Sequence, residues 1–204
     1  MKKLKLIFAS FFFVCFSLFF TSCDSKDLLD NVPPLKIPLT DISIDIPLTF
    51  DTTDTPTPDA ALKSTSADFY SFSGESGSIN LQNEMFEKLK QYENSSIELL
   101  VSDVKVKIET QDGGTIVRNF TSTTRGDIVE TYTKEGDINV GGAGFSDTEL
   151  TNHMQKIFGA IQNNKTVNIE VSGKTNIDPN SIESAEVVVV TIIPSITAQI
   201  KLIK

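Results

Sequence analysis

The chain has 204 residues, with 18 basic against 27 acidic side chains and a formal net charge of −9. Phosphate backbones require clustered Lys and Arg, so this charge excludes a nucleic acid as an expected partner. The length suits one medium domain or two small ones. The chain has 3 Tyr and no Trp, and sugar sites usually stack on these rings, so a carbohydrate partner is also disfavoured.

The first segment of the chain has the order of a secretory signal peptide. Lys2, Lys3 and Lys5 precede an uncharged, mostly apolar run, Leu6–Phe20. A spanning helix needs roughly 20 apolar residues, so this run is short for one and is typical of a signal peptide. It ends in Phe20-Thr21-Ser22-Cys23. The segment resembles the signal peptides of bacterial lipoproteins, whose lipobox ends in Cys; Phe20 departs from the usual Leu.

The resemblance implies that residues 1–22 are removed and that Cys23 becomes the acylated first residue of the mature chain. Two other interpretations stay open: an ordinary signal peptide with an incidental cysteine, and a retained N-terminal anchor helix. Two or more acyl chains give stable attachment without spanning. We therefore expect a lipid-anchored protein of the bacterial cell envelope, held at the outer membrane on its periplasmic face or at the cell surface.

Removal of the leader would change both charge and thiol content. Its three lysines would leave, moving the net charge from −9 to about −12. Cys15 would leave too, and Cys23 would be acylated, so the mature domain would keep no free thiol. This excludes disulfides, a Cys nucleophile and Cys-based zinc sites.

Residues 23–36 are predicted to form a tether, because Pro33-Pro34 favours extended backbone. Ile42–Phe50 alternates apolar and polar residues, which predicts a strand, and Pro47 indicates an edge strand. Asp51–Ser66 reads as a Thr/Pro/Asp-rich loop and lacks the spacing of a calcium loop. Its start, Asp51-Thr52-Thr53, resembles a bacterial O-glycosylation sequon.

A helix is predicted at about 80–92, capped by Asn80 and followed by a long strand, Ile97–Glu109. Gln111-Asp112-Gly113-Gly114 predicts a hairpin turn into the strand Thr115–Thr121. Further short strands are expected at Phe69–Phe72 and Ile128–Thr133, whereas Ile138–Val140 is a short apolar stretch before a glycine-rich break.

A second helix is predicted at about 147–162, because Ser146-Asp147-Thr148-Glu149 forms a capping box before an apolar stripe. The last predicted strands are Thr166–Ser172, Ala185–Ile193 and Thr197–Ile203, with Pro194-Ser195 separating the final two. The pattern Leu81-x-Asn83-x-Met85 recurs as Leu150-x-Asn152-x-Met154. This suggests an internal duplication of a helix–strand–strand unit, with coincidence between two amphipathic helices as the alternative.

Signals for catalysis are poor. His153 is the single histidine, and its spacing from Leu150 and Ile157 places it at the border of the helix's apolar stripe. The sequence has neither His-x-x-x-His nor a Gly-x-Ser-x-Gly elbow. We therefore expect no catalytic residue, no metal site and no cofactor.

These observations predict an α+β, mainly β fold over residues 37–204: a single antiparallel, sandwich-like domain with two amphipathic helices. The function they favour is non-enzymatic binding or scaffolding of another envelope protein, with the membrane contacted through the lipid anchor. One alternative is a small-ligand or lipid carrier with an apolar cavity between sheet and helices. A further alternative is an envelope hydrolase, which needs clustered carboxylates in a cleft.

Overall fold

The computed structural model describes residues 32–51, 68–108, 114–182 and 186–201. The predictions for the lipobox, for Cys23, for most of the loop after Asp51 and for the turn at 111–113 lie outside the described residues. In the described part of the chain, no helix combines the length and hydropathy that crossing a membrane requires.

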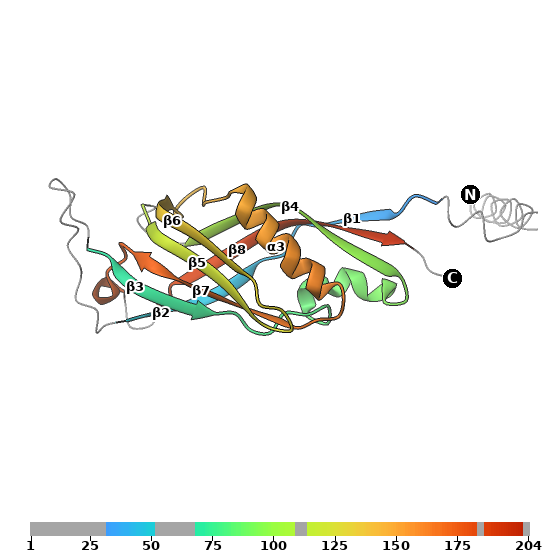
Figure 1. Ribbon diagram of the computed structural model, residues 1–204, viewed down its shortest axis with the longest axis horizontal. Coiled ribbons are helices and arrows are strands. Elements are labelled where there is room, and N and C mark those ends of the chain that lie inside the picture. Colours follow the sequence, from blue (N-terminus) through green and yellow to red (C-terminus); the bar gives the residue numbers. More distant parts are fainter. Residues whose placement is uncertain (1–31, 52–67, 109–113, 183–185, 202–204) are drawn as a thin grey trace, which may run out of the picture.

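The protein is mainly β, with one curled antiparallel sheet of eight strands in the order β1-β8-β2-β3-β7-β5-β6, and with β4 on the other side of β8. The strands are β1 Leu35–Leu39, β2 Ile44–Phe50, β3 Tyr70–Glu75, β4 Ser96–Ile108, β5 Ile116–Gly126, β6 Thr131–Asn139, β7 Val167–Thr175 and β8 Val189–Lys201. The helical segments are η1 Glu84–Tyr92, α3 Thr148–Ile161 and η2 Pro179–Ser181. Figure 1 shows an elongated molecule in which β1, at the start of the described chain, and the end of β8 lie at the same end.

The sheet curls because β2 belongs to both of its halves. Ile44–Pro47 pairs with β8, and Leu48–Phe50 pairs with β3. At this corner Gly74 lies opposite Leu48, and a Cβ on Gly74 would lie 2.5 Å from the carbonyl oxygen of Pro47. Only glycine allows β3 to approach β2 so closely, so this residue fixes where the sheet turns.

Helix α3 fills the inner side of the curl. Its N-cap is Asp147, whose side chain accepts a hydrogen bond from the backbone N–H of Leu150, as an N-cap should. The ring of Phe158 meets that of Phe86 from η1 edge-on, with centroids 6.2 Å apart. The apolar stripe of the helix is buried, with Leu150, Met154, Ile157, Phe158 and Ile161 fully enclosed. Burial of this stripe holds the helix on the sheet.

The free edge of β4 is covered along much of its length. Along the first half of this edge, the side chain of Gln155 from α3 accepts a hydrogen bond from the N–H of Val101 at 2.7 Å. It also donates one to the carbonyl of Leu99 at 2.9 Å. Gln162 accepts from the N–H of Leu99 at 2.7 Å. In its second half, the edge bonds to Val140 and Phe145. The two glutamines thus replace a neighbouring strand, which protects an edge that would otherwise pair with other chains.

Several strand predictions were wrong in their details. Strand β2 is not an edge strand, because β8 and β3 lie on its two sides. The residues around Pro194 do not separate two strands, since β8 runs continuously through them. Pro194 lies between the β8 residues that pair with β1 and those that pair with β2, beside a bulge in β4. A missing N–H is tolerated at such a place.

The predicted hairpin between β4 and β5 is also wrong. In the described residues β4 pairs with β8, whereas β5 pairs with β6 and β7. The first helix is a 3-10 helix that starts after Asn83 rather than Asn80, because the Asn80 side chain closes a turn onto the N–H of Gln82. Strand β1 was not expected from the sequence, and its first two residues fall within the predicted tether. The second helix is confirmed at Thr148–Ile161.

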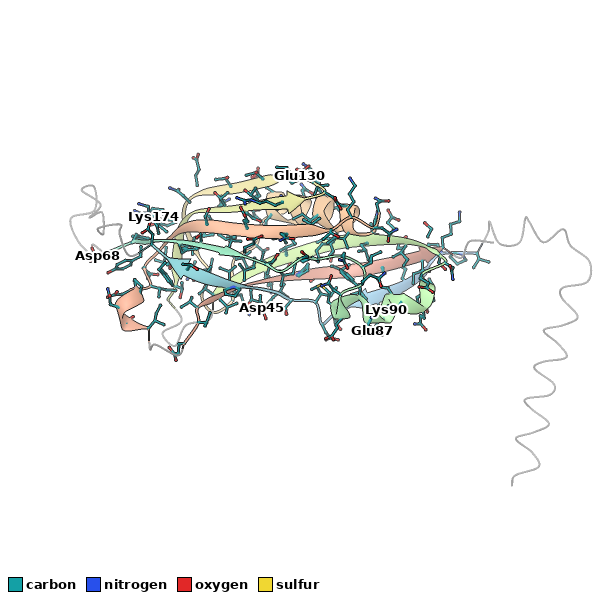
Figure 2. All side chains as sticks on the ribbon, turned by 90° about the horizontal axis from the view of Figure 1, so that it is seen from below. Asp45, Asp68, Glu87, Lys90, Glu130 and Lys174 are labelled. Carbon is teal, nitrogen blue, oxygen red and sulfur yellow. The ribbon has the colours of Figure 1, made fainter. Side chains whose placement is uncertain are left out.

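Charged side chains are distributed over the whole length of the molecule. Figure 2 shows Glu87 and Lys90 of η1 toward one end, and Lys174 and Asp68 toward the other. Among the described residues, no buried side-chain nitrogen or oxygen lacks a hydrogen-bond partner.

Candidate functional site

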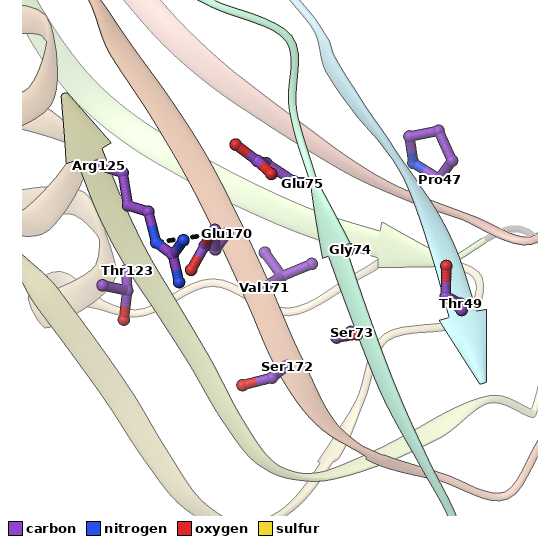
Figure 3. A pocket seen from close by; sticks show the side chains of 10 residues that line it. All are labelled: Pro47, Thr49, Ser73, Gly74, Glu75, Thr123, Arg125, Glu170, Val171 and Ser172. Carbon is purple, nitrogen blue, oxygen red and sulfur yellow. Dashed lines mark ion pairs between the residues drawn. The ribbon is translucent and has the colours of Figure 1, made fainter. Parts of the chain in front are cut away.

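A groove of about 550 Å³ opens on the outer face of the sheet, across β2, β3, β7 and β5. Figure 3 shows β2 along one border, β5 along the other, and β3 and β7 between them. The lining side chains are mostly polar because outward positions alternate with core positions along each strand. The groove is lined by Pro47, Thr49, Ser73, Gly74, Glu75, Thr123, Arg125, Glu170, Val171 and Ser172.

Two carboxylates face each other at one end of this groove. Glu75 on β3 lies directly opposite Glu170 on β7, an arrangement that repels unless each charge has a partner. Arg125 supplies one, with its Nε 2.6 Å from Oε1 of Glu170, and Figure 3 shows the two side chains directed toward each other. The second carboxylate, Glu75, accepts a hydrogen bond from the neutral amide of Asn168 at 2.9 Å.

A row of hydroxyl side chains crosses the same face. The strand registers place one Ser or Thr beside the next from β2 to β6, and spacings of about 4.8 Å between strands make the row about 19 Å long. The Oγ1 atoms at its β5–β6 end lie 3.3 Å apart. The row consists of Thr49, Ser73, Ser172, Thr121 and Thr133.

An ion pair borders the hydroxyl row on β5 and β6. Arg118 donates to both carboxylate oxygens of Asp137, at 2.6 and 3.0 Å. The hydrogen bond from Arg118 holds the pKa of Asp137 below its ordinary value, although partial burial opposes this. The guanidinium also lies 4.1 Å from the ring centroid of Phe69. Arg118 is therefore fixed by a carboxylate and by an aromatic face.

On the inner face, His153 meets a partner that the sequence did not indicate. Its Nε2 lies 3.2 Å from Oγ of Ser122 on β5, and both residues are buried. Its ring lies 6.0 Å from that of Tyr132. Burial lowers the pKa of His153 to about 4, with the charges of Glu130 and Lys156 acting in opposite directions. The imidazole is therefore neutral at neutral pH.

The neighbouring carboxylate, Asp147, ties the helix to β6. Tyr132 and Lys134 each donate to its Oδ2 at 3.0 Å. Burial alone would raise the pKa of Asp147, but its hydrogen bonds from Leu150, Lys134 and Tyr132 lower it below the ordinary value. Burial and the bond to Asp147 raise the pKa of Tyr132. These groups form a structural junction between α3 and the sheet.

The serine–histidine pair lies where a substrate has no access. Ser122 is 0% exposed and His153 5% exposed, so neither presents a reacting atom at a surface. Within the described ranges, no three His, Cys, Asp or Glu side chains converge in the way a metal ion requires.

Two smaller cavities flank η1, each of about 160 Å³. One lies between η1 and the β1–β2 connection and includes Leu39, Ile42 and Met85. The other includes Leu89, Ile97 and the polar end of Gln162. Both are small beside typical ligand pockets of roughly 300–1,000 Å³.

The structure brings together residues that the sequence analysis did not connect. His153 was predicted at the border of a buried stripe and is itself buried. The groove was missed completely, because its residues come from four strands between Pro47 and Ser172. Alternation along β2 could have marked Thr49 as outward, but only the registers show which residues lie beside it.

No family model, no curated protein and no solved structure matches this chain.

Proposed function

We propose that this protein is a lipid-anchored component of the bacterial cell envelope that binds another envelope component without catalysing a reaction. The observation that carries the proposal is the contrast between its two faces. The inner face of the sheet is filled by α3, whereas the outer face has an open, polar groove of about 550 Å³. Concave sites with a few placed polar groups are the usual location of binding.

The proposal of a lipid anchor rests on the sequence. The order of lysines, apolar run and Phe20-Thr21-Ser22-Cys23 supports acylation of Cys23. The first described strand begins at Leu35, so eleven residues, 24–34, separate the proposed anchor from the sheet. A linker of that length leaves the groove accessible to components beside the membrane.

The carrier alternative has less support in the packing of the interior. A carrier needs an open cavity lined by Leu, Ile and Phe side chains. Here the positions that would line it are occupied, since Met154, Ile157 and Phe158 of α3 are each 0% exposed. The hydrolase alternative has less support in the groove, where Glu170 and Glu75 are already engaged by Arg125 and Asn168.

The finer architecture is part of the same proposal. We infer that the two halves of the curled sheet correspond to the layers of a sandwich-like fold, joined through β2. The duplication stays a prediction, because Leu150–Met154 lies in an α-helix whereas Leu81–Met85 leads into a 3-10 helix.

Site-specific crosslinking tests the proposed binding role. The mature chain is expected to have no free thiol, so Ser73→Cys would carry a benzophenone maleimide at a single position in the groove. Ser195→Cys is the matched control, because Ser195 is exposed on β8 away from the groove. Illumination of membranes should give a defined adduct from Ser73→Cys and none from Ser195→Cys. Equal or absent adducts at both positions would contradict a binding role for the groove.

A further inference from the structure

Hydroxyl side chains are a prominent kind of polar group on the outer face of the sheet. Five hydroxyl side chains lie in one transverse row from Thr49 to Thr133. Three of them, Thr49, Ser73 and Ser172, line the groove. A hydroxyl both donates and accepts hydrogen bonds, and it can rotate to suit its partner. Such a row therefore complements a ligand that itself carries many hydroxyl groups.

Both arginines on this face are engaged by carboxylates, and Glu75 accepts a hydrogen bond from the neutral amide of Asn168. Arg125 pairs with Glu170, and Arg118 pairs with Asp137. A polyanion or polycation would gain little net attraction from paired charges, and it would have to compete with them. The ligand that the face fits is therefore neutral.

An apolar ligand is also disfavoured. The apolar side chains that line the groove are Pro47 and Val171, and Val171 is only 1% exposed. Binding would therefore depend on hydrogen bonds rather than on the burial of apolar surface.

We propose that the groove binds a neutral glycan of the envelope, lying across the strands along the hydroxyl row. This inference rests on the proposed function and names its ligand class. The paired Arg125 and Glu170 lie beside the row, on β5 and β7, and offer a donor and an acceptor that suit neighbouring sugar hydroxyls. The scarcity of Tyr and the absence of Trp disfavour ring stacking alone, whereas this face recognises hydroxyl groups by hydrogen bonding.

Affinity electrophoresis tests the ligand class. The full acylated protein, purified in detergent, would migrate through gels that contain the neutral polysaccharide fraction extracted from envelopes of the producing cells. Gels with the anionic fraction and gels without polymer are run in parallel. The variant is Ser73→Ala with Ser172→Ala, which removes two hydroxyls from the groove. The matched control is Ser102→Ala with Ser195→Ala, on strands β4 and β8.

We expect the neutral fraction to retard the wild type and the control equally, and the groove variant to bind about tenfold more weakly. Retardation by the anionic fraction alone, or equal retardation of both variants, would overturn the glycan assignment. Absence of retardation would overturn it too. If the Ser73→Cys crosslink formed in any of these cases, the groove would remain a binding site for another partner. If the crosslink also failed to form, both the glycan assignment and the binding role of the groove would be contradicted.

Discussion

The Oγ of Ser122 lies 3.2 Å from Nε2 of His153, inside the protein and between β5 and α3. This contact has the chemical composition of a catalytic pair, but its surroundings give it a structural role. Both residues are buried, and the imidazole packs beside the ring of Tyr132. A buried neutral histidine makes folding sensitive to pH.

Acid should destabilise the protein through His153. Its pKa is about 4 when folded, against an ordinary value of 6.5, so the unfolded state binds more protons between these values. The stabilisation is complete above pH 6.5 and is lost as the pH falls toward 4. We expect urea unfolding to show a loss of about 2 to 3 kcal/mol from this group between pH 7 and 4.5. His153→Gln, which does not titrate, should show a correspondingly smaller loss; an identical pH dependence would contradict the assignment.

The side chain of Gln155 should contribute to stability as a substitute for a strand. Gln155→Ala removes two hydrogen bonds to the backbone of Leu99 and Val101 and leaves an N–H without its partner. Chemical denaturation should show a loss of about 1 to 3 kcal/mol. Gln91→Ala is the control, because Gln91 is exposed on η1 and its loss should have little effect. Equal effects of the two substitutions would refute the role given to Gln155.

The edge-on contact of Phe86 and Phe158 should join η1 to α3 energetically. Both rings are 0% exposed, so Phe158→Ala should cost about 3 to 5 kcal/mol. A double-mutant cycle with Phe86→Leu and Phe158→Leu should give a coupling energy of about 0.5 to 1.5 kcal/mol. Additive effects would show that η1 packs independently of α3.

Glycine should be required at the corner of the sheet. In Gly74→Ala the new Cβ would lie 2.5 Å from the Pro47 carbonyl oxygen, so β2 and β3 must separate. We expect a loss of about 1 to 3 kcal/mol in the free energy of unfolding. Gly77→Ala serves as a control, since a Cβ on Gly77 would have no described atom within 4 Å beyond its chain neighbours. Tolerance of Gly74→Ala would mean that the corner is not set by this contact.

The sequence predicts the parts of this fold that depend on local pattern. The apolar stripe of the second helix predicts α3, and alternation in Ile44–Phe50 predicts β2. The predicted capping box is wrong in its cap, because Asp147 rather than Ser146 is the N-cap and the Ser146 hydroxyl donates to Asp103. Pairing between distant strands is not a local property. The glycine-rich turn after Gln111 suggested a hairpin, yet β4 pairs with β8 about ninety residues later.

The groove shows the same limit. Ser73 and Ser172 become neighbours only through the register of β3 and β7. A slip of one residue would place Phe72 and Val171 outside instead, so burial of these side chains fixes the register. The outward row is thus a consequence of core packing that no short stretch of sequence contains.

We propose that the folded domain is held on a membrane by an acylated Cys23. Intact-mass analysis of the protein extracted from membranes tests this claim directly. We predict a chain that begins at Cys23 and carries the mass of its acyl groups, and a Cys23→Ala variant that is neither cleaved at this position nor acylated. An unacylated chain, or one that retains residues 1–22, would contradict the account.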